Sequence, residues 1–114
     1  MDTSLPDSNH KPFVVLYRWR VRPGFEDQFV QGWRGVSRAY KRDRGALGAR
    51  LHQGTDGLWY SYAVWPSAQK REEAFSAGSP DPAASALVKE ATVECLPEII
   101  LDLVVDLLGS ENDT

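Results

Sequence analysis

The chain contains very little cysteine and histidine. Among its 114 residues there is one cysteine, Cys95, and there are two histidines, His10 and His52. A single thiol cannot form a disulfide within the chain, which favours a reducing compartment. One cysteine and two distant histidines lack the spacing of a zinc site, and the sequence has no glycine-rich phosphate loop. We therefore expect neither a metal nor a cofactor.

Long hydrophobic runs and excess positive charge are absent too. The longest apolar stretch, 99–108, is interrupted by Asp102 and Asp106 and is too short to cross a bilayer. No N-terminal stretch has the pattern of a signal peptide. The net charge of −3 disfavours binding to nucleic-acid phosphates or to anionic membranes. We expect a cytoplasmic protein that has neither nucleic acid nor a membrane as a partner.

Aromatic residues are abundant instead. They form 11% of the chain and include four Trp and four Tyr. Such side chains bury large areas, so they either build a core or line a pocket. The length fits one domain, which we expect at 13–108. A flexible arm at 1–12 and a flexible tail at 109–114 would flank it.

Hydrophobic periodicity predicts six elements in the order strand, helix, two strands, helical crossover and strand. The expected strands are 13–21, 46–53, 58–65 and 98–107, and the expected helical segments are 25–44, 68–77 and 83–91. An Asp-Gly turn at 54–57 joins the second and third strands as a hairpin. Gly32 and Gly35 are unfavourable inside the first helix, and we attribute them to a close approach to the sheet.

This order predicts an α+β, ferredoxin-like βαββαβ fold. Its four-stranded antiparallel sheet has the strand order 4-1-3-2, with helices on one face. We expect Arg18 and Arg20 on the other face to pair with Asp102 and Asp106 across strands. That face would otherwise be too apolar for solvent, so we expect a second copy to cover it in a homodimer. Its apolar side chains are Val14, Leu16, Leu58, Tyr60, Tyr62 and Val64.

Three segments, taken in order, resemble the antibiotic-biosynthesis-monooxygenase family. The VRPG sequence at 21–24, followed by an acidic amphipathic helix, resembles the family's strand-to-helix corner. The GALGARL sequence at 45–51 is similar to its second strand. The YAVWPS sequence at 62–67, with Phe75 downstream, is similar to its strand, Trp, Ser, helix and Phe segment. The resemblance covers about residues 13–107.

The resemblance implies a dimeric α/β barrel with one pocket per subunit, between sheet and helices. Some members are cofactor-independent oxygenases of phenolic polyketides or quinol-like compounds, in which the substrate supplies the electrons. Others degrade haem. The haem-degrading members use an Asn, a Trp and a His at places that hold Tyr17, about Gly78 and about Val88 here. Haem degradation is therefore not expected.

The resemblance and the strand alternation indicate candidate site residues. Trp65 matches the Trp that lines the family's pocket, and Tyr17 lies on the face of the first strand expected to look toward it. His52 is a candidate base, because imidazole is a common general base in enzymes. Core packing is the alternative for Trp65 and Tyr17, and a surface position for His52. We expect the substrate-binding residues to be Trp19, Trp33, Trp59, Ser61 and Phe75.

The function expected from these residues is a cofactor-independent monooxygenase acting on an aromatic, phenolic or quinol-type compound. Ser61 replaces an Asn that the polyketide oxygenases carry, so a non-catalytic ligand-binding dimer on the same scaffold is the alternative. An RNA-binding sheet is a third reading, because Tyr60, Tyr62, Arg18 and Arg20 could imitate a base-stacking surface. The acidic net charge weighs against it.

Overall fold

The computed structural model describes residues 12–108. Its elements follow the predicted order, which is therefore confirmed, with the second crossover made of two helices. They are β1 (Phe13–Val21), α2 (Glu26–Asp43), β2 (Gly48–Gln53), β3 (Trp59–Trp65), α3 (Ala68–Ser76), α4 (Pro82–Ala91) and β4 (Thr92–Asp102). Apart from Pro12, the arm expected at 1–12 and the tail expected at 109–114 lie outside the described residues.

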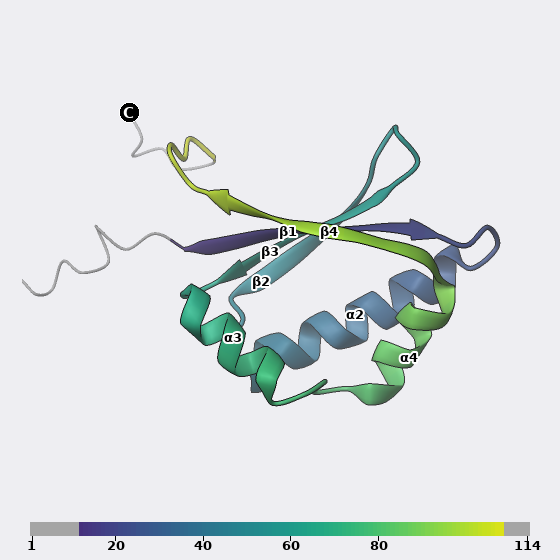
Figure 1. Cartoon of the computed structure of the whole chain (residues 1–114), viewed down its shortest axis with the longest axis horizontal. Helices are drawn as coiled ribbons and strands as arrows, with labels where there is room; N and C mark the ends of the chain where they lie inside the picture. The colour runs from purple at the N-terminus through teal and green to yellow at the C-terminus, as the bar shows by residue number, and fades with distance from the viewer. Residues whose placement is uncertain (1–11, 109–114) are drawn as a thin grey trace, which may run out of the picture.

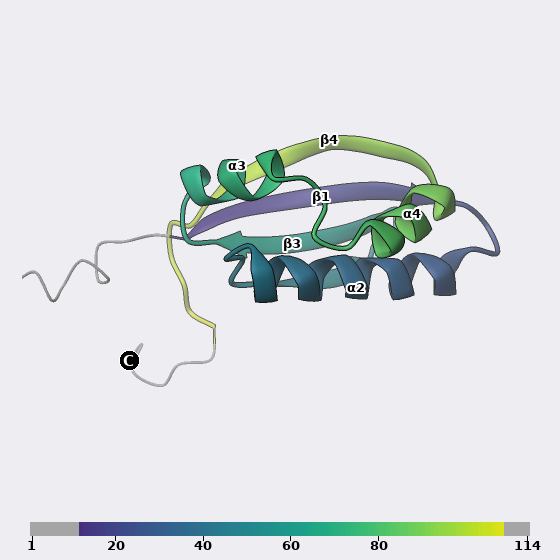
Figure 2. The same cartoon turned by 90° about the horizontal axis from the view of Figure 1, so that it is seen from below.

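The four strands form one antiparallel sheet in the order β2-β3-β1-β4. This is the predicted 4-1-3-2 arrangement. All three helices lie under the same face of the sheet, as the side view in Figure 1 and the view from below in Figure 2 show. The opposite face carries no helix from residues 12–108. The predicted α+β ferredoxin-like fold is thus confirmed, with two layers and one face left open.

The two glycines inside α2 pack against α4 rather than against the sheet. A Cβ atom on Gly32 would lie 2.9 Å from the Leu87 Cβ and from the Ala84 carbonyl oxygen. A Cβ atom on Gly35 would lie 2.8 Å from the Ala84 Cβ. The expected approach to the sheet is therefore wrong: the missing side chains let two helices meet closely beneath it.

The last strand begins six residues earlier than predicted. The sequence prediction of 98–107 treated Pro97 as the entry to the strand, but β4 follows α4 directly at Thr92. Leu16 pairs with Ile99 and Arg18 pairs with Leu96, so two residues, Pro97 and Glu98, oppose one residue of β1. Such a bulge accommodates a proline, which lacks the N–H that a regular ladder needs.

This register also overturns the expected charge pairs. Arg18 donates to the Pro97 carbonyl oxygen at 2.7 Å, and Arg20 pairs with Glu94 at 3.3 Å. Asp102 is the last residue of β4, and Asp106 lies beyond the strand. Neither carboxylate is therefore the partner of Arg18 or Arg20. Four apolar side chains beyond β4 are 68–78% exposed, namely Val104, Val105, Leu107 and Leu108.

A buried cluster of side chains joins β1, β3 and α3. Val15, Trp65 and Ala74 are almost fully buried. Half-buried neighbours pack around them, namely Phe13, Tyr17, Tyr40 and Ala46. The core thus places several large rings at one end of the space between sheet and helices.

Candidate functional site

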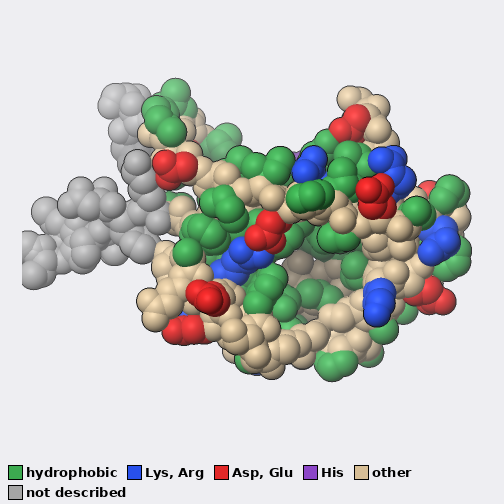
Figure 3. Space-filling model, in the orientation of Figure 1, with side chains coloured by type: hydrophobic (Ala, Val, Ile, Leu, Met, Phe, Trp, Pro, Cys, Tyr) green, Lys and Arg blue, Asp and Glu red, His purple; other side chains and the backbone are tan. Residues whose placement is uncertain are grey.

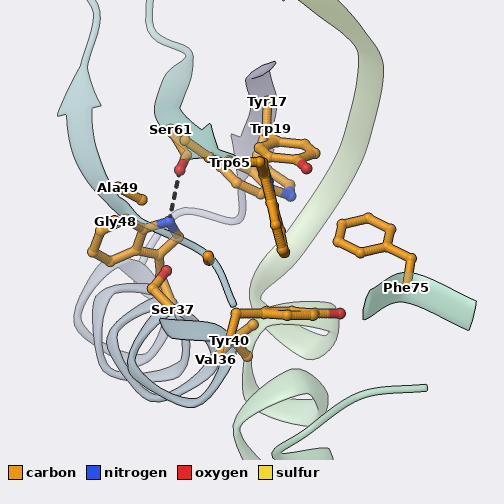
Figure 4. A pocket seen from close by; sticks show the side chains of 13 residues that line it. Tyr17, Trp19, Val36, Ser37, Tyr40, Gly48, Ala49, Ser61, Trp65 and Phe75 are labelled. Carbon is orange, nitrogen blue, oxygen red and sulfur yellow. Dashed lines mark hydrogen bonds between the residues drawn. The ribbon is translucent and has the colours of Figure 1, made fainter. Parts of the chain in front are cut away.

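A cavity of about 150 Å³ lies between the helix-facing side of the sheet and helices α2 and α3. Figure 3 shows the surface hollowed between α3 and α4, with hydrophobic side chains on the walls, and Figure 4 shows the lining in detail. Strands β1 and β3 contribute alternate residues to it, as their period of two requires. The lining residues are Tyr17, Trp19, Trp33, Val36, Ser37, Tyr40, Ala46, Gly48, Ala49, Ser61, Ala63, Trp65 and Phe75.

Small side chains on the sheet create the empty space. Ala49 of β2 is the register partner of Ala63 of β3, and Ser61 lies two residues before Ala63 on the same face. Gly48 also lines the cavity. Large rings from β1, α2 and α3 surround this floor of small residues. The rings therefore line a cavity without filling it.

A hydrogen bond spans the cavity wall from α2 to β3. The Trp33 indole Nε1 donates to the Ser61 Oγ at 3.0 Å, drawn as the dashed line in Figure 4. Ser61 is only 2% exposed, so its oxygen depends on this partner. The Ser61 hydroxyl keeps its own proton, which is free to be donated to a ligand oxygen.

Aromatic rings close the α3 end of the cavity. The Phe75 ring lies 5.3 Å from Tyr40 and 5.9 Å from Trp65 between ring centroids, and Tyr17 lies 6.5 Å away. Figure 4 shows Trp65, Tyr40 and Phe75 turned toward one another. Phe75 is also 42% exposed. Its ring therefore contacts both the cavity and solvent.

The ionisable groups that line the cavity are phenols held neutral. Burial raises the pKa of Tyr17 above its ordinary value, and the positive charge of Arg71 opposes that rise only in part. Burial likewise raises the pKa of Tyr40, against the charges of Arg44 and Arg71. Neither phenol is ionised near neutral pH, so the Tyr17 hydroxyl can donate a hydrogen bond but is a poor base.

Most of the predicted site residues lie together. The cavity lining includes Tyr17, Trp19, Trp33, Ser61, Trp65 and Phe75. Trp59 instead packs edge-on against Phe29 at 5.5 Å, and His52 is exposed in a separate groove beside it. The structure therefore does not bring His52 or Trp59 to the cavity.

Sequence reasoning missed several residues at the site. Tyr40 lies on the same apolar stripe of α2 as Trp33, so the helical spacing that indicated Trp33 could have indicated it too. Gly48 and Ala49 lack a sequence signal, because their contribution is the space that they leave. Arg71 of α3 also lacked one, although its guanidinium lies 5.6 Å from the Tyr17 ring centroid.

Residues 12–108 contain neither a cluster of metal ligands nor a membrane-spanning helix. No three His, Cys, Asp or Glu side chains gather there as metal ligands would. None of the helices in this range is long and apolar enough to cross a membrane.

Comparisons with known proteins agree with this architecture. The family model described as antibiotic biosynthesis monooxygenase matches residues 12–79, more than half of the chain. No curated protein is found to match.

Solved structures share the fold at low sequence identity. The cofactor-independent oxygenase SnoaB from Streptomyces nogalater has a TM-score of 0.69 and 14% identity, over 86% of this chain and 98% of that one. A candidate antibiotic biosynthesis monooxygenase from Bordetella bronchiseptica has a TM-score of 0.67 and 20% identity, over 84% of this chain and 98% of the other. Another candidate antibiotic biosynthesis monooxygenase, from Caulobacter crescentus, has a TM-score of 0.64 and 17% identity, over 85% of this chain and 92% of that one.

Proposed function

Because this chain belongs to the antibiotic biosynthesis monooxygenase family, we propose that it is a cofactor-independent monooxygenase acting on a small aromatic, phenolic or quinol-type compound. The observation that carries this proposal is the cavity between sheet and helices, lined by aromatic rings with a few polar atoms among them. Such a lining suits a flat apolar ring whose orientation a few hydrogen bonds determine.

The size of the cavity narrows the expected substrate. A cavity of about 150 Å³ equals the size at which an apolar protein cavity takes up benzene. A single ring therefore fits the site as it stands. A tricyclic anthrone is larger than this volume, so we expect a monocyclic hydroquinone to be the better substrate.

The reaction needs no external reductant. A hydroquinone and O₂ give a hydroxyquinone and water: one oxygen atom forms a bond to a ring carbon, and the other leaves as water. The substrate loses two O–H hydrogens and one C–H hydrogen and gains one O–H, so it supplies all four electrons that O₂ accepts. Trp65 would stack on the ring, and the Tyr17 and Ser61 hydroxyls would orient its oxygens. His52 has no role in this scheme.

Oxygen uptake with a panel of hydroquinones, phenols and anthrones tests the proposal. We expect uptake with monocyclic hydroquinones, incorporation of one ¹⁸O atom from ¹⁸O₂ into the product, and a loss of about tenfold or more in kcat/KM in Trp65→Phe. His52→Ala, changed outside the cavity, is the matched control and should keep full activity. The absence of uptake with every compound would contradict the oxygenase assignment.

A non-catalytic ligand-binding protein is the second candidate. One observation favours it: among the described residues that line the cavity, none carries a charge, and Tyr17 and Tyr40 are held neutral. A catalytic base is therefore not evident in the lining. Binding of the same aromatic panel without oxygen uptake would support this candidate.

We further propose that the chain forms a homodimer through its open sheet face. Two of the charged groups near that face are paired within the chain: Arg20 pairs with Glu94, and Asp56 accepts from the Tyr60 hydroxyl. The face also carries apolar side chains that keep part of their surface exposed, namely Leu16, Tyr62, Val64, Leu96, Ile99 and Leu101. A second copy would bury this surface, at roughly 25 cal/mol per Å² of apolar area.

Light scattering coupled to gel filtration tests the dimer. We expect a mass near twice the 12.7 kDa of one chain, and a shift toward the monomer in Val64→Glu. A monomer that binds single-stranded RNA would refute the homodimer and favour the RNA-binding alternative. A cytoplasmic location is part of the same proposal, based on the single cysteine, Cys95.

A further inference from the structure

The hydroxyl of Ser37, inside α2, has no hydrogen-bond partner within residues 12–108. Every other serine in that range makes a hydrogen bond, namely Ser61, Ser67, Ser76, Ser79 and Ser85. Ser76 of α3 donates to the Glu72 carbonyl oxygen at 2.8 Å, one helical turn earlier. A serine in a helix can satisfy its hydroxyl in this way. Ser37 leaves that bond unmade and lines the cavity instead.

The Ser37 hydroxyl can be reached from the cavity. The residue is half-buried, and its unpartnered oxygen keeps accessible surface. Ser37 lies one turn after Trp33 on the face of α2 that lines the cavity, and the Trp33 indole donates to Ser61. Figure 4 shows Ser37 and Ser61 on one side of the cavity and Phe75 on the other. The two hydroxyls thus give one side of an aromatic cavity a polar character.

The folded chain gains nothing from a serine at this position. Alanine has a higher helix propensity than serine, and an alanine methyl group would suit neighbours such as Val36, Ala46 and Ala63 in the same lining. The Ser37 hydroxyl makes no bond within residues 12–108 that would offset this. A molecule that enters the cavity is therefore the partner that remains for it.

The two hydroxyls differ in what they can still offer. A serine oxygen donates one hydrogen bond and accepts up to two. Ser61 already accepts from the Trp33 indole, and its own hydrogen is unused. Ser37 uses neither its hydrogen nor its lone pairs. A phenolic hydroxyl matches this pair, because its oxygen can accept from Ser61 while its hydrogen is donated to Ser37.

The lining also favours an uncharged ligand oxygen. Among the described residues that line the cavity, none has a charged side chain. An ionised oxygen that moves from water into such a lining loses its hydration without gaining a charged partner. A phenol that keeps its hydrogen loses less, and that hydrogen is what Ser37 can accept.

We infer that Ser37 and Ser61 form a polar subsite for the neutral hydroxyl of a single-ring phenol, with Ser37 as the specificity-determining residue that accepts the phenolic hydrogen. The inference rests on the proposed function, because it uses the same cavity. It adds the form of the ligand that binds and the residue that recognises it.

Calorimetric titration of the full-length protein with phenol and toluene tests the subsite. The two probes have nearly the same size, but only phenol has a hydroxyl. Ser37→Ala should weaken phenol binding roughly three- to tenfold, as the loss of one hydrogen bond implies, and should leave toluene binding unchanged or slightly tighter. Ser76→Ala removes a hydroxyl that is bonded within α3 and lies outside the cavity lining. It is the matched control, and both affinities should stay unchanged in it.

Thermal unfolding of Ser37→Ala separates recognition from a structural role. The hydroxyl has no partner in the chain, and alanine favours the helix, so the Tm should be unchanged or higher. A clear fall in the Tm would mean that the hydroxyl serves the folded chain, and it would overturn the subsite.

The possible results also separate the two proposals. If Ser37→Ala leaves phenol binding unchanged, or weakens phenol and toluene equally, the subsite is overturned and the aromatic cavity stands. If phenol, toluene and the hydroquinones all fail to bind to the wild type, the cavity is not a ligand site, and both proposals are overturned. Selective loss of phenol binding without any oxygen uptake would support the subsite and contradict the oxygenase.

Discussion

Replacing Ser61 by Ala should destabilise the protein through the indole that it leaves without a partner. The Trp33 Nε1 donates to the Ser61 Oγ at 3.0 Å, and Ser61 is 2% exposed. The net loss of such a bond costs about 1 kcal/mol, and a donor left buried and dry costs about 1–3 kcal/mol. We therefore expect a loss of about 1–3 kcal/mol in the free energy of unfolding. For a domain of this size, each kcal/mol lowers the Tm by about 4–8 °C.

A double-mutant cycle measured by thermal unfolding isolates this bond. Trp33→Phe removes the hydrogen-bond donor, so that no indole is left unpaired when Ser61 is replaced. Ser61→Ala should therefore lower the free energy of unfolding much less in Trp33→Phe than in the wild type. We expect a coupling energy between Ser61→Ala and Trp33→Phe of about 0.5–3 kcal/mol. Strict additivity of the two changes would refute the reasoning, because it would mean that the bond contributes nothing to folding.

Three further predictions follow from the helices and the buried phenol. Gly32→Ala should lower the Tm, because its Cβ would lie 2.9 Å from α4 atoms and overpacking costs about 1–3 kcal/mol, more than the gain of about 1 kcal/mol in helix propensity. Gln31→Ala, on the exposed side of α2, is the control, and a rise in the Tm of Gly32→Ala would contradict the close contact between the two helices. Asp81→Ala should lower the free energy of unfolding by about 0.5–2 kcal/mol, because Asp81 Oδ1 accepts from the Ala84 N–H at 3.0 Å at the start of α4. Chemical denaturation measures this loss, and an unchanged midpoint would count against the helix cap. Burial raises the pKa of Tyr17 in the folded state, so the contribution of this phenol to the free energy of unfolding is fully present below the unfolded pKa of about 10 and is lost as the pH rises through the folded pKa. Between neutral and alkaline pH, Tyr17→Phe should therefore lose less stability than the wild type, and identical profiles of stability against pH would argue against burial of this phenol.

Local sequence patterns were sufficient for the order of the elements and for much of the cavity lining. Alternation along 13–21 and three-four spacing from Phe25 to Tyr40 depend only on the periods of a strand and a helix. Once the order of elements indicated a ferredoxin-like sheet, the same alternation placed Tyr17, Trp19, Ser61 and Trp65 on the helix-facing side. These residues do line the cavity.

The errors arose where two segments distant in sequence have to fit each other. Pro97 was treated as the start of a strand, because nothing in its own neighbourhood shows that one residue of β1 opposes two of β4. Gly32 and Gly35 were attributed to the sheet, because a helix pattern shows which face is small but not which element approaches it.

The sequence by itself determined the type and order of the elements and the helix-facing sides of β1 and β3, since these follow from the spacing of neighbouring residues. The register of β4, and with it the face on which Ile99 and Leu101 lie, was not determined in this way. Only the tertiary structure decided that the rings surround a cavity, because the space depends on Ala49 and Ala63 meeting across two strands. It alone placed Arg71 beside Tyr17, 54 positions earlier in the chain. Periodicity specifies which way a side chain points, whereas the partner it meets depends on the register and packing of the whole molecule.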